Sequence, residues 1–433
     1  MAVLLIFTHQ ISPRFTYITR QLFTRILGIE IRFTTKVEDF IGHKGPKITY
    51  TRQPLQNEFF IRSHELLFQH GVEEVEIQMG EWEALPCFFR AGDRSNIPYD
   101  IFAASFYLIS RYEEYLPHVK DMHGRYTPKD SLAFTHGFLQ SPLIDLWAYK
   151  LLEALQERFP ELAARPGAYR FIPVIDVTTS HCFAMRGFFR GLGGLLFDLS
   201  RLRMRRVWDR IRVWAKPSLD PYDNYDRLIA MHQQYPVDAM YFFQFAEYST
   251  YDKNVSTNNN RFRYLIKSVA DYSVVSLSVS YTGSRDVRVM KEEKKRLSEV
   301  LNRPVKYSRL RYNRVEIPQT YRDLAEAEFT EDYTMGYSYD LGFRASTCTP
   351  FYFYDIALES QQPIRIVPFA FHDYALLGQD PRGAMTASLD RMYSQVKQVN
   401  GTLVGVFSNE LLGGHQTEGW MEFYESVLKK YHA

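Results

Sequence analysis

Short apolar runs that end in a polar residue recur through the second half of the chain, with helical segments between them. The first run is residues 171–175, and Asp176 follows it directly. Similar runs occur at 239–245, 274–280, 364–368 and 402–407. Because segments between them, such as 224–234, have helical apolar spacing, each run predicts a strand that a helix joins to the next. This alternation favours a parallel sheet, whose polar side chains gather at the carboxyl ends of the strands.

The first part of the chain also has α/β character. Strand-like or helical spacing occurs at 3–7, 15–27, 29–33, 48–50 and 144–159. Residues 100–115 are apolar almost all round, which predicts a central helix. Pro166 and Gly167, in the string AARPGAYR, are the clearest break in the pattern. We therefore predict a smaller α/β domain of residues 1–165, followed by a larger one of residues 166–433.

The composition predicts a folded protein with no overall attraction for nucleic acid. Apolar residues make up 45% of the 433 residues, enough for a large core. Lys and Arg number 52 against 50 Asp and Glu, so the formal net charge is only +2. A charge this small produces no strong field, and a charged partner would need a local patch. We expect no nucleic-acid partner.

The cysteines and the first residues predict a cytoplasmic protein. Cys87, Cys182 and Cys348 are far apart and form no CxxC pattern, which argues against a disulfide framework and against a zinc finger. The opening MAVLLIFT has no basic residue before it and no cleavage site after it, so it predicts a strand and not a signal peptide. No stretch of about 18 apolar residues occurs.

Several long strings of the chain resemble a known family. By order and spacing, FIPVIDVTTSH, VVSLSVSYTG, SRLRY and VGVFSNE resemble the NodB-homology polysaccharide deacetylases, as does EFTEDYTMGYSYDLGFRASTCTPFYFYD. In the first half, YDIFAASFYLISRYEEYLPHVKDMHGRY and DSLAFTHGFLQSPLIDLWAYKLLEAL resemble a domain of unknown function that precedes the barrel in a bacteroidete branch. The resemblance covers nearly the whole chain. It implies a distorted (β/α) barrel of NodB type preceded by a smaller α/β domain.

The family chemistry requires particular residue types at the strand ends. Its members hold a divalent metal such as zinc through an Asp and two His, use a second Asp as the base, and use a late His as the acid. The resemblance places Asp176 at the base position. The metal-binding positions fall on Thr178 and Ser278, and the acid position falls on Ser408.

The resemblance also assigns substrate-binding positions. Arg309 is kept in the family's Arg-x-His stretch, but Arg311 stands in place of the His. The other residues at these positions are Tyr281, Arg344, Asp373 and Asn409.

Hydroxyl groups cannot replace the missing side chains. A neutral hydroxyl is a poor metal ligand and cannot protonate an amine near neutral pH. Loss of metal activation together with the acid raises the barrier by on the order of 8 kcal/mol. We therefore predict no metal cofactor and a pseudoenzyme that binds a carbohydrate or cell-envelope precursor, or acts as a partner scaffold. The alternative is an active hydrolase that deacetylates an N-acetylated sugar, with a site rebuilt around Asp176.

Other interpretations of the same residues remain open. Asp176 is also placed to cap the following helix. His181, Cys182 and His372 form a metal set with Asp176 and Asp373 if their strand ends adjoin, although isolated histidines are more often packing residues.

Arginines suggest two further binding surfaces. Arg309, Arg311 and Arg344 at one barrel mouth would suit an anionic small molecule, and the alternative is an ion-pair network with Glu331, Asp332 and Asp340. The segment from Arg186 to Lys216 mixes arginines with aromatic residues, which suits an acidic partner or a membrane surface. A solvated helical insertion over the barrel mouth is the alternative for that segment. Its GLGG string does not complete a nucleotide-binding motif.

Overall fold

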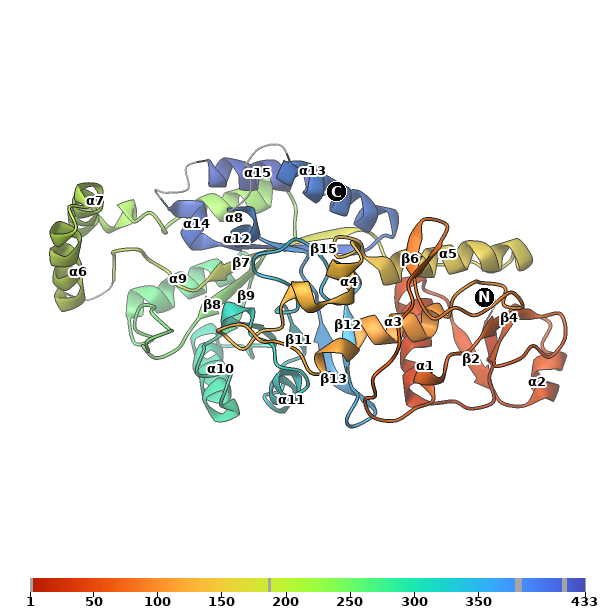
Figure 1. Ribbon diagram of the computed structural model, residues 1–433. Helices are drawn as coiled ribbons and strands as arrows, with labels where there is room; N and C mark the ends of the chain where they lie inside the picture. The colour runs from red at the N-terminus through yellow and green to blue at the C-terminus, as the bar shows by residue number, and fades with distance from the viewer. Residues whose placement is uncertain (1–2, 186–187, 378–383, 415–418, 433) are drawn as a thin grey trace.

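The computed structural model describes residues 3–185, 188–377, 384–414 and 419–432. It has mixed α/β architecture with two separate parallel sheets, one in each half of the chain (Figure 1). The smaller sheet lies at one end of the molecule and the larger sheet lies at the centre. In the described residues, no helix combines the length and the apolar character needed to cross a lipid bilayer.

The smaller sheet has four strands, all parallel. In spatial order they are β2 (Ile31–Thr34), β1 (Leu4–Phe7), β3 (Lys47–Thr51) and β4 (Phe59–Arg62). The accompanying helices are α1 (Pro13–Thr19), which continues as a π-helix (Arg20–Ile26), α2 (Val37–Gly42), α3 (Ile101–Ile109), α4 (Leu132–Thr135) and α5 (Leu143–Arg158). A short hairpin joins β5 (Gly80–Trp82) to β6 (Leu85–Cys87).

The helix predicted over residues 100–115 is shorter in the structure than the apolar pattern indicates. Helix α3 ends at Ile109, because Arg111 adopts a left-handed backbone conformation with φ of 56°. The Arg111 side chain is buried, and its Nε donates to Glu114 Oε1 at 2.8 Å. A buried ion pair therefore ends the helix where the apolar spacing alone would continue it.

The larger sheet has nine strands and forms a curled half-barrel. In spatial order they are β12 (Phe351–Asp355), β13 (Ser360–Ile366), β11 (Glu331–Asp332), β10 (Tyr307–Leu310), β9 (Val274–Val279), β8 (Met240–Gln244), β7 (Arg170–Val177), β15 (Thr402–Ser408) and β14 (Phe371–His372). Every pairing is parallel except that of β12 with β13. The predicted parallel pairing is confirmed. In the described residues β12 and β14 are the edges of an open sheet.

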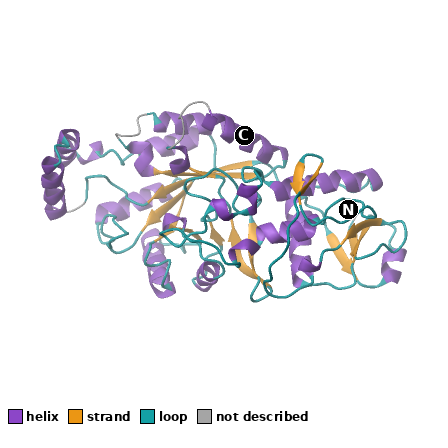
Figure 2. Cartoon of the chain, viewed as in Figure 1, coloured by secondary structure: helices purple, strands orange, loops and turns teal. Residues whose placement is uncertain are grey.

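Helices follow the strands of the larger sheet and pack around it (Figure 2). They are α8 (Tyr225–Gln234), α9 (Asn260–Ala270), α10 (Val287–Leu301), α11 (Gln319–Glu326), α12 (Asp373–Leu376), α13 (Ala384–Gln398), α14 (Asn409–Gly413) and α15 (Trp420–Tyr431). Local residues set their ends: the Asp286 carboxylate caps the start of α10, and Asn302 ends it in a left-handed conformation. Two more helices, α6 (Phe188–Ser200) and α7 (Met204–Ala215), stand apart at the far end of the molecule (Figure 1).

Buried polar contacts join the two halves of the chain. We call these contacts the junction. Arg14 Nε donates to Glu359 Oε2 at 2.9 Å, and Arg344 Nη2 donates to Glu114 Oε2 at 2.7 Å. Asp145 on α5 also accepts from the Thr349 hydroxyl at 2.5 Å. One apolar core cluster includes residues of both sheets. The domain boundary between residues 165 and 166 stays a prediction, and the first strand of the larger sheet begins at Arg170.

Candidate functional site

Four of the predicted positions meet at the carboxyl edge of the larger sheet. In the strand register, Asp176 on β7 lies opposite Ser408 on β15. Ser278 on β9 lies opposite Arg309 on β10 in the same way. Asp176 Oδ2 accepts from Arg309 Nε at 3.1 Å, and its Oδ1 accepts from the Ser278 hydroxyl at 3.3 Å. Parallel pairing brings these groups together because it aligns the strand ends.

The Arg309 guanidinium is fixed on every side. Besides Asp176, it donates to the Tyr333 carbonyl oxygen at 2.7 Å and to Asn313 Oδ1 at 2.6 Å. Its carbon lies 5.0 Å from the centre of the Phe369 ring. Arg309 is fully buried and Asp176 nearly so. The arginine and the carboxylate at the base position are therefore one compensated ion pair.

Ser408 is held by Asp373. The Asp373 carboxylate accepts from the Ser408 amide at 2.5 Å and from its hydroxyl at 2.6 Å, both at Oδ2. Asp373 Oδ1 lies 2.6 Å from His372 Nδ1. The structure thus brings Asp373 and its neighbour His372 to the predicted acid position, where Ser408 itself presents a hydroxyl that cannot protonate an amine near neutral pH.

Thr178 and Asn409 also bond within the protein. The Thr178 hydroxyl donates to Glu410 Oε1 at 2.8 Å. Asn409 Nδ2 donates to the Thr179 carbonyl oxygen at 2.9 Å.

This donor set does not fit a divalent metal. The predicted metal-binding positions offer the hydroxyls of Thr178 and Ser278, and the nearby carboxylate of Asp176, at the base position, is already paired with Arg309. Metals of this class prefer His, Asp, Glu or Cys ligands. Among the described residues, no three His, Cys, Asp or Glu side chains form a group that could hold a metal ion. The structure therefore does not assemble the alternative set of His181, Cys182 and His372.

Tyr281 and Arg311 lie in an aromatic group beyond the strand ends. The Tyr281 ring packs on Tyr251 at a centroid distance of 4.2 Å, and its amide donates to Asp252 Oδ1 at 3.0 Å. Arg311 Nε donates to the Tyr251 carbonyl oxygen at 3.2 Å and lies 3.7 Å from Asp252 Oδ1. Its guanidinium carbon lies 4.9 Å from the Tyr312 ring centre.

The three predicted arginines do not form one cluster of free charge. Arg309 pairs with Asp176, Arg311 approaches Asp252, and Arg344 pairs with Glu114 from the first half of the chain. Arg344 is buried in the junction, so it does not face a ligand at the strand ends. Arg344 does not join the alternative ion-pair network with Glu331, Asp332 and Asp340, because its partner Glu114 is 230 residues earlier in the chain.

Two adjoining cavities open beside the ends of β8 and β9. We call them together the cleft. The larger has a volume of about 620 Å³, and the smaller has a volume of about 490 Å³. Both are lined by Ala246, Glu247, Tyr248, Glu292 and Arg296. The larger is also lined by Ser249, Asp252, Ser280, Thr282, Asp286, Arg288, Val289 and Glu293. Asp176 lines neither cavity.

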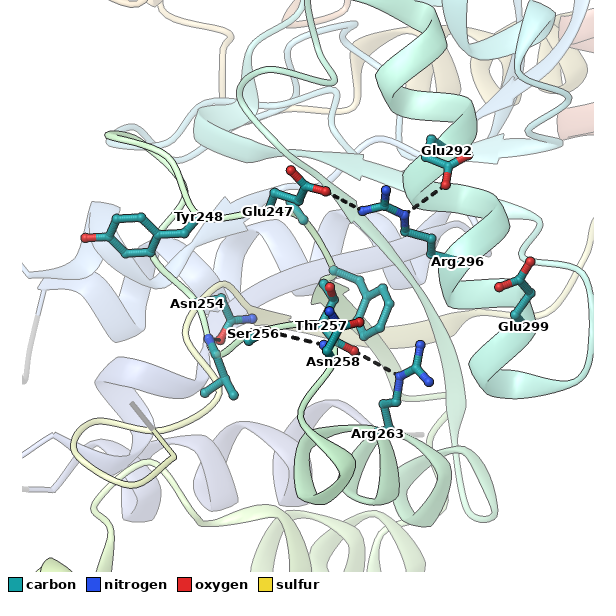
Figure 3. A pocket seen from close by; sticks show the side chains of 13 residues that line it. Glu247, Tyr248, Asn254, Ser256, Thr257, Asn258, Arg263, Glu292, Arg296 and Glu299 are labelled. Carbon is teal, nitrogen blue, oxygen red and sulfur yellow. Dashed lines mark hydrogen bonds and ion pairs between the residues drawn. The ribbon is translucent and has the colours of Figure 1, made fainter. Parts of the chain in front are cut away.

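Figure 3 shows how the smaller cavity is lined. Arg296 on α10 lies between Glu247 and Glu292 and donates to each at 2.9 Å. Arg263 on α9 donates to the Thr257 carbonyl oxygen at 2.9 Å. Tyr248 lies at the rim, and 59% of its surface is exposed. The wall is therefore polar, with an aromatic side chain at its edge.

Glu293 has an unusual environment in the larger cavity. It is buried, and Oε2 accepts from the Ser280 amide at 3.1 Å. Burial, helped by the nearby Asp252 charge and opposed by the hydrogen bonds from Ser280, raises the pKa of Glu293 to about 7. This carboxyl therefore changes charge near neutral pH.

Sequence patterns predicted no role for several of these residues. Glu410 stands inside the string VGVFSNE, and Tyr374 follows Asp373 directly. Burial and the charges of Glu410 and Asp373 raise the pKa of Tyr374, so its hydroxyl stays protonated beside them. Asp252 and Glu293 lie in segments without a motif. A regular spacing could have identified Glu293 only as part of the charged helix α10.

Comparison with known proteins gives one sequence family and distant structural neighbours. Residues 4–160 match a family of unknown function, DUF7033. No curated protein matches the chain. The solved structures that it resembles include a putative polysaccharide deacetylase from Mycobacterium smegmatis, with 15% identity over 60% of this chain and 84% of that one, and a TM-score of 0.38.

Two further neighbours are an allantoinase and a mutant of a CE4 family pseudoenzyme. PuuE allantoinase is 11% identical over 60% of this chain and 84% of that one, with a TM-score of 0.37. A mutant of a CE4 family pseudoenzyme with restored enzymatic activity is 11% identical over 56% of this chain and 67% of that one, with a TM-score of 0.26. At these values the function has to be argued from the residues of this chain.

Proposed function

We propose that the chain is a non-catalytic protein of NodB-type polysaccharide deacetylase architecture that binds a carbohydrate in the cleft. The observation that carries the proposal is the separation of two features at the same sheet edge. The position for metal chemistry offers one paired carboxylate and hydroxyls, whereas an open polar cleft lies beside it.

The residues at the base and acid positions support the absence of catalysis. Asp176 is already paired with the buried Arg309, and the donors around them are too poor to hold a metal. Ser408 presents a hydroxyl where an amine would have to be protonated. Without metal activation and an acid, the barrier to amide hydrolysis is higher by on the order of 8 kcal/mol.

The chemistry of the cleft supports a sugar as the ligand. Its volumes of about 620 and 490 Å³ are in the range that small-molecule sites occupy. The wall contains carboxylates and the hydroxyls of Ser280 and Thr282, groups that bond to sugar hydroxyls. Tyr248 at the rim offers a ring for the apolar face of a sugar.

The charge of the cleft supports a neutral or amino sugar over an anionic one. The larger cavity is lined by five carboxylic side chains and two arginines. Both arginines have carboxylate partners: Arg296 has Glu247 and Glu292, and Arg288 has Asp286. An anionic ligand would meet an excess of negative charge, which is unfavourable in a partly enclosed site.

A binding experiment with matched saccharides tests this ligand class. We would titrate oligomers of N-acetylglucosamine, glucosamine and a uronic acid into the protein and measure heats of binding. We expect binding of the first two, weakened about tenfold by Tyr248→Ala, which corresponds to a loss of about 1.4 kcal/mol. Tyr264→Ala removes an exposed tyrosine on α9 that lines neither cavity and should have no effect. Preference for the uronic acid, or no saccharide binding, would contradict the proposal and favour the anionic ligand or the scaffold role.

An activity experiment tests the absence of catalysis. We would measure acetate release from N-acetylglucosamine oligomers with zinc, cobalt or manganese added. We expect no release above background in the parent or in Asp176→Asn. Metal-dependent release that Asp176→Asn abolishes would establish the alternative, an active hydrolase with a rebuilt site.

A further inference from the structure

Helices α6 and α7 form a hairpin that stands apart from both sheets (Figure 1). We call residues 188–219 the arm. The two helices pack on each other: Asp198 on α6 accepts from Arg210 Nη2 on α7 at 2.8 Å. Gly194 allows this approach, because a Cβ there would lie 2.8 Å from the guanidinium of Arg210. Val207 and Val213 of α7 are buried.

Each helix of the arm also exposes an apolar stripe. On α7, Met204, Trp208 and Ile211 are exposed at i, i+4 and i+7, so they lie on one face. On α6, Leu192, Leu196 and Leu199 are exposed with the same spacing. Trp208 is 62% exposed and Leu196 is 61% exposed. Helices of soluble proteins bury a stripe of this spacing, so these faces indicate a binding surface.

The exposed charge of the arm has a single sign. The exposed charged side chains between 191 and 219 are Arg201, Arg203, Arg205, Arg206, Arg212 and Lys216. The only acidic residues in this range, Asp198 and Asp209, are buried. The whole chain has a formal net charge of only +2, so this basic surface is a local feature.

We propose that the arm binds the surface of an anionic lipid membrane, with its apolar stripes in the headgroup region and its arginines against the lipid phosphates and carboxylates. Exposed Leu and Trp beside Arg, with no exposed acid, is the pattern of helices that lie in a membrane interface. Trp208 and Trp214 have an apolar ring and a polar N–H, which suits the boundary between lipid and water.

The charge of the arm argues against a second copy of the chain as its binding partner. Two arms packed face to face would oppose six exposed cations to six others, with no exposed carboxylate of the arm between them. An anionic membrane neutralises these charges and accepts both stripes without a complementary shape. This proposal does not depend on the ligand of the cleft.

Vesicle binding by the full chain tests the proposal. We would mix the protein with vesicles of phosphatidylcholine alone or of phosphatidylcholine and phosphatidylserine, and measure co-flotation at low and high salt. We expect flotation only with phosphatidylserine, and less of it at high salt. The double variant Trp208→Ser and Ile211→Ser should weaken binding at least tenfold, and so should Arg203→Gln with Arg212→Gln.

Matched controls separate the arm from the rest of the surface. Leu358→Ser and Arg303→Gln alter an exposed apolar and an exposed basic residue elsewhere, and both variants should float like the parent. Circular dichroism and the melting temperature confirm that the arm variants fold. No flotation with either vesicle, or equal flotation of the stripe variant, would overturn the proposal. Concentration-dependent dimers that the stripe variant abolishes would overturn it in favour of a second copy, and tight binding to an acidic polypeptide without flotation would do so in favour of an acidic protein partner.

Discussion

The junction and the cleft each bury a glutamate, but the pKa values of the two carboxyl groups shift in opposite directions. Glu114 in the junction is 6% exposed and Glu293 in the cleft wall is 5% exposed. Although burial alone would raise it, Arg344 and Arg111 hold the pKa of Glu114 at about 2. Glu293 has hydrogen bonds from Ser280 in place of an ion pair, and burial raises its pKa to about 7.

The partners of a buried charged group, and not its burial alone, decide whether the group stays charged. A carboxylate held by two arginines keeps its charge over the whole range in which proteins work, so it can only join parts of the structure. A buried carboxyl without a cation titrates near neutral pH and responds to whatever enters beside it. We therefore expect the cleft to bind a ligand and the junction to stabilise the fold.

Removal of the Glu114 carboxylate from the junction should have the largest effect on stability. Glu114→Gln leaves Arg344 buried without a countercharge, and Arg111 keeps only Glu113. Loss of one member of a buried ion pair typically costs about 3–5 kcal/mol. We therefore expect the free energy of unfolding, measured with urea, to fall by that amount.

An exposed ion pair provides the control for this measurement. Glu326 pairs with Lys291 at 2.8 Å, and both side chains are largely exposed. Glu326→Gln should change the free energy of unfolding by less than about 1 kcal/mol. If Glu114→Gln cost no more than this control, the contrast between the junction and the surface would be wrong.

Glu293 in the cleft should make the stability of the protein depend on pH. The pKa of Glu293 rises from 4.5 to about 7 on folding, so between these values the folded protein keeps a proton that the unfolded chain releases. The folded state therefore loses stability as pH rises from about 4.5 to 7, by on the order of 3 kcal/mol. Glu293→Gln cannot titrate, so its stability relative to the parent should increase over this interval.

Glu292, the neighbour of Glu293 on α10, provides a control variant in the same cleft. Glu292 also lines both cavities, but its side chain is half exposed and pairs with Arg296. Glu292→Gln should leave the slope of stability against pH unchanged between 4.5 and 7. Parallel curves for the parent and Glu293→Gln would show that Glu293 does not carry the raised pKa.

Local pattern predicted the parts of the fold that depend on strand alternation. Asp176 and Ser408 directly follow predicted apolar runs, the family resemblance placed Ser278 in the same site, and the parallel register brings the three together. The strand β10 was not predicted, because its sequence YSRL contains an arginine in place of an apolar residue. That arginine is buried only because Asp176, on a strand far away in sequence, supplies its countercharge.

The remaining site residues depend on contacts that spacing does not encode. Arg344 was predicted beside Arg309, but Glu114, on a 3₁₀ turn after α3, draws it into the junction. The carboxylates of the cleft come from α10 and from the loop after β8, and neither has a motif. The arm differs from these site residues, because its mixture of arginine and aromatic residues predicted an amphipathic surface from the sequence. The structure adds that the acids of the arm are buried and most of its leucines are exposed.

Removal of the Ser280 hydroxyl beside Glu293 should have the smallest effect of the three changes. The Ser280 hydroxyl hydrogen-bonds to Glu293, which lowers the pKa of that carboxyl, and it accepts from the Gly283 amide at 2.8 Å. Ser280→Ala removes both bonds and should cost about 1 kcal/mol of stability. Since a bond to the charged form is lost, the pKa of Glu293 should rise further, which side-chain carbon chemical shifts in an NMR titration would follow. Ser276→Ala, on β9 just before this position, removes a bond to the Tyr307 carbonyl oxygen and should cost similar stability while the titration of Glu293 stays where it was. A fall in the pKa of Glu293 in Ser280→Ala, or an equal shift in Ser276→Ala, would mean that the hydroxyl does not act on the carboxylate.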